Sequence, residues 1–241
     1  MQLPRLVQAA MRRIVVTLSL GLVLGLAPGL RFASAAEKVD LALVLAVDCS
    51  YSVDASEFRL QIKGLADAFH RSDIHDAIKG GPSGRIAVTL MEWSDDKNQL
   101  LVLPWTILDS PEAADNFADR VGRVRRGLAE GGTAIGDALR FAAAVLMASP
   151  YATERRVIDL SSDGRNNRGD LVTIARDEVV ARGITINGLP ILNEWPTLDK
   201  YFEQQIIGGP YHFMIPANDY EAYGNAIARK LLREITGPGI S

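Results

Sequence analysis

The chain has 241 residues, of which 48% are hydrophobic, 7% aromatic and 23% charged, with 21 Gly, 11 Pro and a single Cys. This is an ordinary globular composition, and it excludes collagen, a coiled coil and wholesale disorder. The 26 Lys and Arg against 29 Asp and Glu give a formal net charge of −3, and this acidity argues against a surface that binds nucleic acid or an anionic membrane.

Residues 1–35 have the pattern of a secretory signal. The basic pair Arg12 and Arg13 precedes an apolar run at 14–27, and the sequence ASA at 33–35 matches an A-x-A cleavage pattern. An uncleaved transmembrane anchor is the alternative, but the run is shorter than the ~20 apolar residues that a spanning helix needs. We therefore expect a signal peptide that is removed, and a mature protein that is periplasmic or secreted. No Cys follows the run to accept a lipid, so no stable membrane anchor is expected.

The predicted signal carries four arginines and no acidic residue, so its removal takes the formal charge from −3 to −7. The remaining 206 residues suit one domain with a sizeable core, which we place at 38–236. A single Cys cannot form an intramolecular disulfide, so core packing must hold the exported domain together. The expected role of Cys49 is that of a small residue packed at a strand end.

From residue 38 onward, apolar runs alternate with amphipathic segments, which is typical of strands and helices around a parallel sheet. The run at 39–47 is apolar almost throughout, as expected for a central strand. A polar turn at 94–98 separates strands expected at 85–93 and 99–108, and so short a connection forces that pair to be antiparallel. The predicted fold is therefore α/β, a doubly wound, mostly parallel sheet with one antiparallel edge strand and helices on both faces. The remaining strands are expected at 157–161, 184–191 and 211–215, and the helices at 55–69, 110–126, 134–148, 170–182, 198–207 and 219–235.

Three loops that lie far apart in the sequence follow this alternation to the same edge of the sheet, the carboxyl ends of the parallel strands, where open α/β sheets bind ligands. The side chains of interest in these loops all end in oxygen. Carboxylates and hydroxyls without a His or Cys pair suit a hard cation such as Mg²⁺ or Mn²⁺ better than zinc or copper. The candidate metal ligands are Asp48, Ser50, Ser52, Thr133 and Asp163.

The segments VDCSYS at 47–52, GGTAIGDAL at 131–139 and SSDG at 161–164 resemble the von Willebrand factor A domain family. In that family D-x-S-x-S, a distant Thr and a distant Asp form a metal-ion-dependent adhesion site (MIDAS). The resemblance covers nearly all of residues 38–236, and GITINGLPI at 183–191 is similar to the family's next strand. It extends to a bacterial family of exported proteins with a single A domain, from which no defined ligand can be carried over.

The resemblance implies how the metal is held: Ser50, Ser52 and Thr133 would contact it through their hydroxyls, and Asp48 and Asp163 would act mostly through bound water. With neutral direct ligands the cation keeps much of its charge and one open octahedral position. The resemblance therefore implies a Glu or Asp of a partner protein as the ligand, with carbohydrate or a small acid as alternatives. The expected function is an exported, divalent-cation-dependent binding module without catalysis.

The sequence leaves two alternatives to a metal-dependent binding module, an enzyme and a scaffold. A phosphohydrolase of the haloacid dehalogenase type also places an Asp after its first strand, but it needs a second Asp two residues on, where this chain has Ser50. A serine hydrolase is disfavoured because the sequence has no G-x-S-x-G motif. The spacing of His70, His75 and His212 matches no zinc motif. The second alternative, a scaffold that keeps the fold and has little use for metal, stays open.

Three further features are expected to lie near the site or to depend on it. Trp195 follows a strand and should lie on or near the metal-binding edge, as an exposed binding residue or as a loop anchor. Tyr51 stands where many members of the family carry Gly, so its ring is expected to shape the approach of the ligand. The closing helix at 219–235 is expected to pack on the sheet, and its coupling to ligand binding is a hypothesis.

Overall fold

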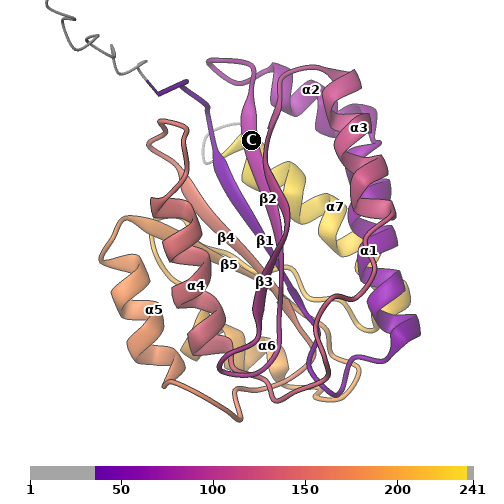
Figure 1. Ribbon diagram of the computed structural model, residues 1–241, viewed down its shortest axis with the longest axis vertical. Helices are drawn as coiled ribbons and strands as arrows, with labels where there is room; N and C mark the ends of the chain where they lie inside the picture. Colours follow the sequence, from indigo (N-terminus) through magenta and orange to yellow (C-terminus); the bar gives the residue numbers. More distant parts are fainter. Residues whose placement is uncertain (1–35, 238–241) are drawn as a thin grey trace, which may run out of the picture. The chain divides into compact units, whose positions relative to one another are not determined.

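The structure, a computed structural model, describes residues 36–237, so the predicted signal at 1–35 lies outside the described residues. At its centre is a five-stranded sheet with the strand order β3-β2-β1-β4-β5 (Figure 1). Strand β1 pairs in parallel with β2 and β4, β4 pairs in parallel with β5, and only β2 and β3 are antiparallel. The strand bounds are β1 (Ala42–Asp48), β2 (Ile86–Trp93), β3 (Gln99–Leu108), β4 (Arg156–Ser162) and β5 (Ile184–Pro190).

The central position of β1 follows from its sequence, because every residue of ALVLAVD is buried. Side chains of successive residues point to opposite faces of a sheet. Leu43 and Leu45 accordingly belong to one apolar cluster, and Ala42 and Val44 belong to a second cluster on the other face. A strand without a polar face is stable only between two helical layers.

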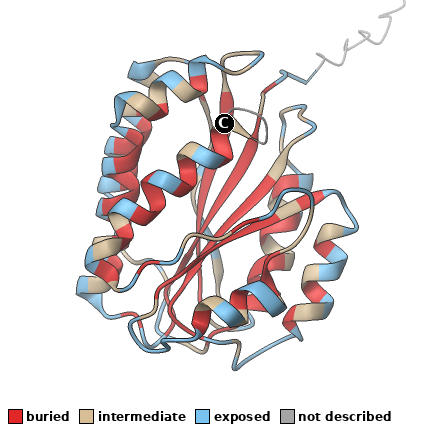
Figure 2. Ribbon diagram, turned by 180° about the vertical axis from the view of Figure 1, so that it is seen from behind, coloured by how far each residue is buried: buried red, intermediate tan, exposed pale blue. Residues whose placement is uncertain are grey.

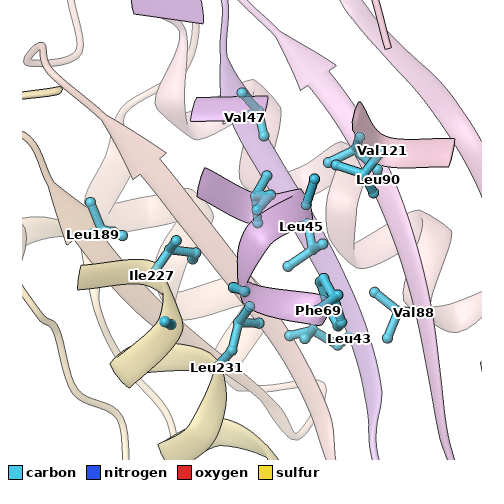
Figure 3. Close-up of a cluster of buried hydrophobic side chains, with 14 of the residues drawn as sticks. Leu43, Leu45, Val47, Phe69, Val88, Leu90, Val121, Leu189, Ile227 and Leu231 are labelled. Carbon is cyan, nitrogen blue, oxygen red and sulfur yellow. The ribbon is translucent and has the colours of Figure 1, made fainter. Parts of the chain in front are cut away.

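The first helical layer covers one face of the sheet, as Figure 3 shows for its side chains. Phe69 meets Phe117 edge-on, with their ring centroids 5.0 Å apart. Two of these helices cross closely at glycines, because a Cβ on Gly64 would lie 2.9 Å from the Cα of Gly224. The helices of this layer are α1 (Ala55–Phe69), α2 (Ser72–Lys79), α3 (Pro111–Gly122) and α7 (Tyr220–Thr236).

The second layer covers the opposite face of the sheet. It consists of α4 (Ile135–Met147), α5 (Val172–Val180), α6 (Leu198–Tyr201) and the π-helical turn η1 (Phe202–Ile206). Figure 2 shows that the strands are buried along most of their length, whereas the helices are buried mainly on the side that faces the sheet. In the described part of the chain, no helix is long and apolar enough to cross a membrane.

Helix starts match the sequence analysis where a capping side chain marks them. Asp54 accepts hydrogen bonds from the backbone N–H groups of Ser56 and Glu57, and Glu57 bonds back to the N–H of Asp54, which forms a capping box in front of α1. Ser110 caps α3 in front of Pro111. Helix α2 was not predicted, because no side chain caps its N-terminus and only two of its eight residues are buried.

Three predicted elements differ in the structure. No strand forms at 211–215, where Met214 makes one isolated bridge to Gly188 and Tyr211 has a φ of 57°, a left-handed conformation that no strand accepts. The predicted helix at 110–126 ends at Gly122, because the following residues turn toward the loop after β1. The predicted helix at 198–207 is one α-helical turn followed by a π-helical turn.

Candidate metal centre

The candidate ligands lie at the carboxyl edge of the sheet, which is its lower edge in Figure 1. Asp48 is the last residue of β1, and Asp163 directly follows the last residue of β4, the neighbouring strand. Thr133 precedes α4 in the chain. Parallel pairing of β1 with β4 therefore brings two carboxylates together that are more than one hundred residues apart in the sequence.

Asp48 is fully buried, with both of its carboxylate oxygens engaged. The backbone N–H of Ser50 donates to Oδ1 at 2.7 Å, and the hydroxyl of Ser162 donates to Oδ2. Burial, followed by the nearby charge of Asp163, raises the pKa of Asp48 from 3.8 to about 7. The ionised form of Asp48 is thus held at a cost to the free energy of folding.

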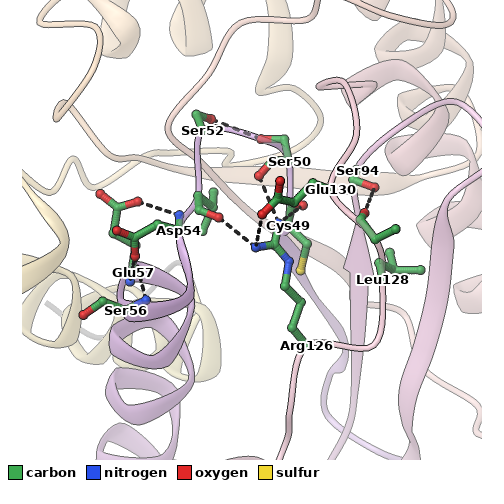
Figure 4. Close-up of polar contacts among 12 residues, drawn as sticks. Cys49, Ser50, Ser52, Asp54, Ser56, Glu57, Ser94, Arg126, Leu128 and Glu130 are labelled. Carbon is green, nitrogen blue, oxygen red and sulfur yellow. Dashed lines mark hydrogen bonds and ion pairs between the residues drawn. The ribbon is translucent and has the colours of Figure 1, made fainter.

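Asp163 is also fully buried and accepts two hydroxyl hydrogen bonds. Ser52 Oγ donates to its Oδ1 at 2.7 Å, and the hydroxyl of Tyr220, from α7, donates to its Oδ2 at 3.0 Å. Ser52 Oγ also lies 3.3 Å from Ser50 Oγ (Figure 4). Burial raises the pKa of Asp163 as it does that of Asp48. Both serine hydroxyls are therefore part of the same hydrogen-bonded cluster as this carboxylate.

Thr133 reaches the cluster on a glycine-rich loop. The N–H of Tyr51 donates to the carbonyl of Gly131 at 2.9 Å, which ties this loop to the segment after β1. The backbone N–H of Thr133 donates to Oδ1 of Asn167 at 2.9 Å. A Cβ on Gly164, the residue after Asp163, would lie 3.3 Å from Oγ1 of Thr133. The structure thus brings all five predicted residues to one place, while their role as metal ligands stays a prediction.

The donor set fits a hard divalent cation. In residues 36–237, neither Asp48 nor Asp163 has a Lys, Arg or His within ion-pair distance, so two buried carboxylates that act on each other through their charges have no counter-charge there. The described residues contain no group of three or more His, Cys, Asp or Glu side chains that could by itself hold a metal ion. A site here would consist of two carboxylates and neutral hydroxyls, the oxygen ligands that Mg²⁺ and Mn²⁺ prefer.

Arg126 holds the segment after β1 in place. Its guanidinium donates to three backbone carbonyls, those of Cys49, Ser50 and Val53, with 2.9 Å to Val53 and 3.1 Å to Ser50 (Figure 4). Cys49 is buried beside it in the first apolar cluster, which confirms its predicted packing role. The sequence analysis placed Arg126 at the end of a helix and missed this function, because no local pattern marks an arginine that binds a loop more than seventy residues away.

Other supporting side chains were missed for the same reason. Gln61 of α1 donates to the backbone carbonyl of Asp48 at 3.2 Å and accepts from the hydroxyl of Ser161 at 3.2 Å. Tyr220 and Asn167 orient Asp163 and Thr133, as described above. Among the supporting side chains, the two serines of the SSDG motif, Ser161 and Ser162, stood within a segment that the sequence analysis had selected.

The three histidines make contacts away from the carboxylate pair. His70 and His75 lie beside Asp115, and Nε2 of His75 is 2.7 Å from the carbonyl of Phe69. His212 contacts the carbonyl of Gly209 through its Nδ1, at 2.7 Å. None of these contacts involves a candidate metal ligand.

A groove with a volume of 660 Å³ opens above the cluster. Of the five candidate ligands, Ser52 and Thr133 line this groove. Trp195 lines it as well and is 49% exposed, which places this residue where the sequence analysis expected it. The other lining residues are Tyr51, Glu130, Gly131, Gly132, Gly164, Arg165, Asn166, Asn167 and Arg168.

Solved structures with the same architecture define the class of fold. A structure of proximal thread matrix protein 1 from the mussel byssus superposes with a TM-score of 0.61 at 14% identity, covering 83% of this chain and 48% of that chain. A von Willebrand factor type A structure from Catenulispora acidiphila gives 0.53 at 18% identity, covering 82% and 43%. BatB from Bacteroides thetaiotaomicron gives 0.53 at 17% identity, covering 82% and 100%. The fold is therefore of the von Willebrand factor A type, as predicted.

The chain spans about half the length of the mussel protein. One structure of that protein has a zinc-occupied MIDAS motif; it is 12% identical with a TM-score of 0.58, covering 83% of this chain and 49% of that chain. The family model described as "Protein of unknown function (DUF1194)" matches residues 38–239, and the chain belongs to this family. No curated protein matches the chain.

Proposed function

We propose that the protein is an exported, divalent-cation-dependent binding module that captures a carboxylate of a protein partner. The observation that carries this proposal is the pair of buried carboxylates, Asp48 and Asp163, which lie near each other beneath a groove with no counter-charge among the described residues. Proteins avoid such a pair unless a cation neutralises it, because taking charges out of water is costly. The zinc-occupied MIDAS motif of the mussel protein supports a divalent cation as the occupant of this fold's site.

The five candidate ligands would bind Mg²⁺ or Mn²⁺ in two ways, directly and through water. The hydroxyls of Ser50, Ser52 and Thr133 would bind the ion directly, and Asp48 and Asp163 would orient its water and balance its charge. When bound, the cation supplies an electrophilic position for an external oxygen ligand. Ser52 and Thr133 line the groove, so a ligand in the groove would meet the ion from their side.

Binding is favoured over catalysis by the state of the side chains. Each Asp48 oxygen already accepts a hydrogen bond, and Ser50 stands where a phosphohydrolase of the dehalogenase type needs its second Asp. A general base must be free to reach the substrate proton it takes. A protein ligand that presents Glu or Asp to the metal is therefore the proposed partner.

Calorimetric titration of the purified protein with Mg²⁺ and Mn²⁺ tests the proposal. We expect micromolar to millimolar binding by the wild type and its loss in Ser50→Ala and in Asp163→Ala. Ser56→Ala is the matched control, because Ser56 lies in the first turn of α1, outside the hydroxyl cluster, and should leave the affinity unchanged. Wild-type protein that binds neither ion, with or without an added glutamate peptide, would instead establish the scaffold alternative.

The export part of the proposal is tested separately. Fractionation of the native cells should place the protein in the periplasm or the medium, and N-terminal sequencing should begin near Ala36, after the A-x-A pattern. A chain that keeps its first 35 residues and sediments with membranes would contradict it.

A further inference from the structure

Arg165, two residues after Asp163, is held in a fixed position at the groove. Its guanidinium carbon lies 5.2 Å from the ring centroid of Trp195 and 5.4 Å from that of Tyr201. Its Nη2 donates to Oγ1 of Thr197 at 3.2 Å. Two aromatic rings and one hydrogen bond thus order the side chain, and an ordered side chain loses less entropy when a ligand binds to it.

The charge of Arg165 has no acidic partner among the residues that the structure describes. Within the described range 36–237, no carboxylate lies within ion-pair distance of its guanidinium. A guanidinium has five N–H donors, and the bond to Thr197 uses one of them. The remaining donors form a planar fork that matches a carboxylate, which makes Arg the side chain best suited to bind one in two-point geometry.

Arg165 and the candidate metal centre share one groove. Arg165 lines the same groove as Ser52 and Thr133. It also lines a neighbouring hollow of 370 Å³, together with Lys200. The one acidic side chain among the described lining residues of the main groove, Glu130, lies 3.9 Å from Arg126. Two arginines, Arg165 and Arg168, thus add positive charge to the groove beside the proposed cation, and Arg165 is the one that lies over aromatic rings.

Two exposed aromatic side chains flank the same groove. Tyr51 is 78% exposed and Trp195 is 49% exposed, and both line it. The loop of Trp195 is anchored, because Asn193 Nδ2 donates to Glu57 of α1 at 3.3 Å. Large, ordered aromatic side chains with a neighbouring Arg are the residue types that dominate the energetics of protein interfaces.

We propose that Arg165 is a second carboxylate-binding anchor, so that the protein partner presents one segment with two acidic side chains, one for the cation and one for Arg165. Tyr51 and Trp195 contact the apolar stems of that segment. This inference rests on the proposed function, since it assigns a second contact to the same partner.

Fluorescent peptides of ten residues test the inference in Mg²⁺, with binding followed by anisotropy. One Gly/Ser peptide carries a single Glu, and a series carries a second Glu placed one to five residues away. At least one member of the series should bind the wild type about tenfold more tightly than the single-acid peptide, the gain typical of one charge-assisted contact. If no member of the series binds more tightly than the single-acid peptide, the inference is overturned.

Variants assign the gain to Arg165. In Arg165→Gln the advantage of the two-acid peptide should disappear, and in Trp195→Ala it should shrink, with Trp195→Phe restoring most of it. Arg182→Gln is the matched control, because it makes the same charge change on an exposed residue beyond α5 and should keep the full advantage. Equal losses in Arg165→Gln and Arg182→Gln would show a general effect of net charge and overturn the inference.

The two proposals fail in different ways. Arg165→Gln should bind Mn²⁺ in the absence of peptide with the wild-type affinity. If the proposed function is wrong, the wild type binds no Mn²⁺ and EDTA does not change peptide affinity. If only the second anchor is wrong, peptide binding depends on the metal but does not distinguish one acid from two. A two-acid advantage that arises from dimerisation of the chain through this groove would appear as a doubled mass in light scattering, and it too would overturn the inference.

Discussion

At the scale of single residues, the site is assembled by side chains that act on one another over long sequence distances. Asp48 and Asp163 are the carboxylates of the proposed metal site, and neighbours hydrogen-bond to them: Ser162 to Asp48, and Tyr220 to Asp163. Each of these contacts joins a different element of the fold to the carboxyl edge of the sheet. The consequence is that changes to supporting residues should alter cation binding without removing a ligand.

Arg126 gives the sharpest case of such support. Replacing it with Lys keeps the charge but cannot satisfy three carbonyls at once, so we expect Arg126→Lys to lower stability by about 1–3 kcal/mol and to weaken Mn²⁺ binding at least about tenfold. The neighbouring exposed Arg125 gives the control Arg125→Lys, which should change neither quantity. Urea unfolding and calorimetry measure the two effects. Wild-type affinity in Arg126→Lys would mean that the segment after β1 does not need this arginine.

Asp48 should trade stability for cation binding. Burial and the charge of Asp163 raise the pKa of Asp48 from 3.8 to about 7, so its ionisation lowers the free energy of unfolding at pH 8. Without metal at pH 8, the free energy of unfolding of Asp48→Asn is therefore expected to exceed that of the wild type by about 1–3 kcal/mol. Excess Mg²⁺ should raise the melting temperature of the wild type and leave the variant unchanged. A variant that is less stable than the metal-free wild type would contradict this account.

At the scale of secondary-structure elements, α7 is tied to the sheet by buried charge at the end away from the groove. Lys230 lies 2.7 Å from both Asp159 of β4 and Glu234, and Asn187 of β5 donates to Glu234 at 2.9 Å. One lysine neutralises one of the two carboxylates. Burial, followed by the charge of Asp159, accordingly raises the pKa of Glu234 from 4.5 to about 8.

The raised pKa of Glu234 predicts the sign of a pH effect. Between pH 4.5 and 8 the folded chain keeps a proton that the unfolded chain releases, so this group's contribution to stability is full below pH 4.5 and is lost as pH rises toward 8. In Glu234→Gln we expect a smaller fall in the free energy of unfolding between pH 5.5 and pH 8 than in the wild type, measured by urea unfolding with EDTA.

Glu203→Gln is the control for this measurement, because Glu203 is an exposed residue of η1 and its removal should keep the wild-type pH dependence. An identical fall in the wild type and in Glu234→Gln would show that Glu234 is ionised in the folded chain throughout this range.

The elements also show which parts of the fold could be predicted from the sequence. Helix α1 has the predicted bounds because Asp54 and Glu57 form a local capping box and its apolar residues recur at helical spacing. The predicted C-terminal end of α3 was wrong, because the true end depends on Arg126, whose hydrogen-bond partners lie in the segment after β1. The strand expected at 211–215 has the right residue types, but the left-handed Tyr211 and a single bridge to β5 leave it without a ladder.

At the scale of the whole molecule, the topology explains why the candidate site was predictable and its surroundings were not. Strand order and chain direction alone place the three loops at one edge of the sheet. The proximity of their oxygen-bearing side chains could therefore be predicted from the sequence. The groove, the contacts of Arg165 with Trp195 and Tyr201, and the hydrogen bond from Tyr220 depend on packing between elements. No local sequence pattern marks such packing. The fold thus sets the place of the candidate site, and tertiary packing sets which side chains surround it.

The central claim is that a divalent cation binds among the five oxygen side chains at the carboxyl edge of the sheet. A crystal of the protein soaked in Mn²⁺ and measured at a wavelength where manganese scatters anomalously tests it most directly. The account predicts one strong anomalous peak in contact with the hydroxyl oxygens of Ser50, Ser52 and Thr133, and its absence in crystals of Asp163→Ala. A fully soaked wild-type crystal with no peak there, or with peaks only at surface carboxylates, would contradict it.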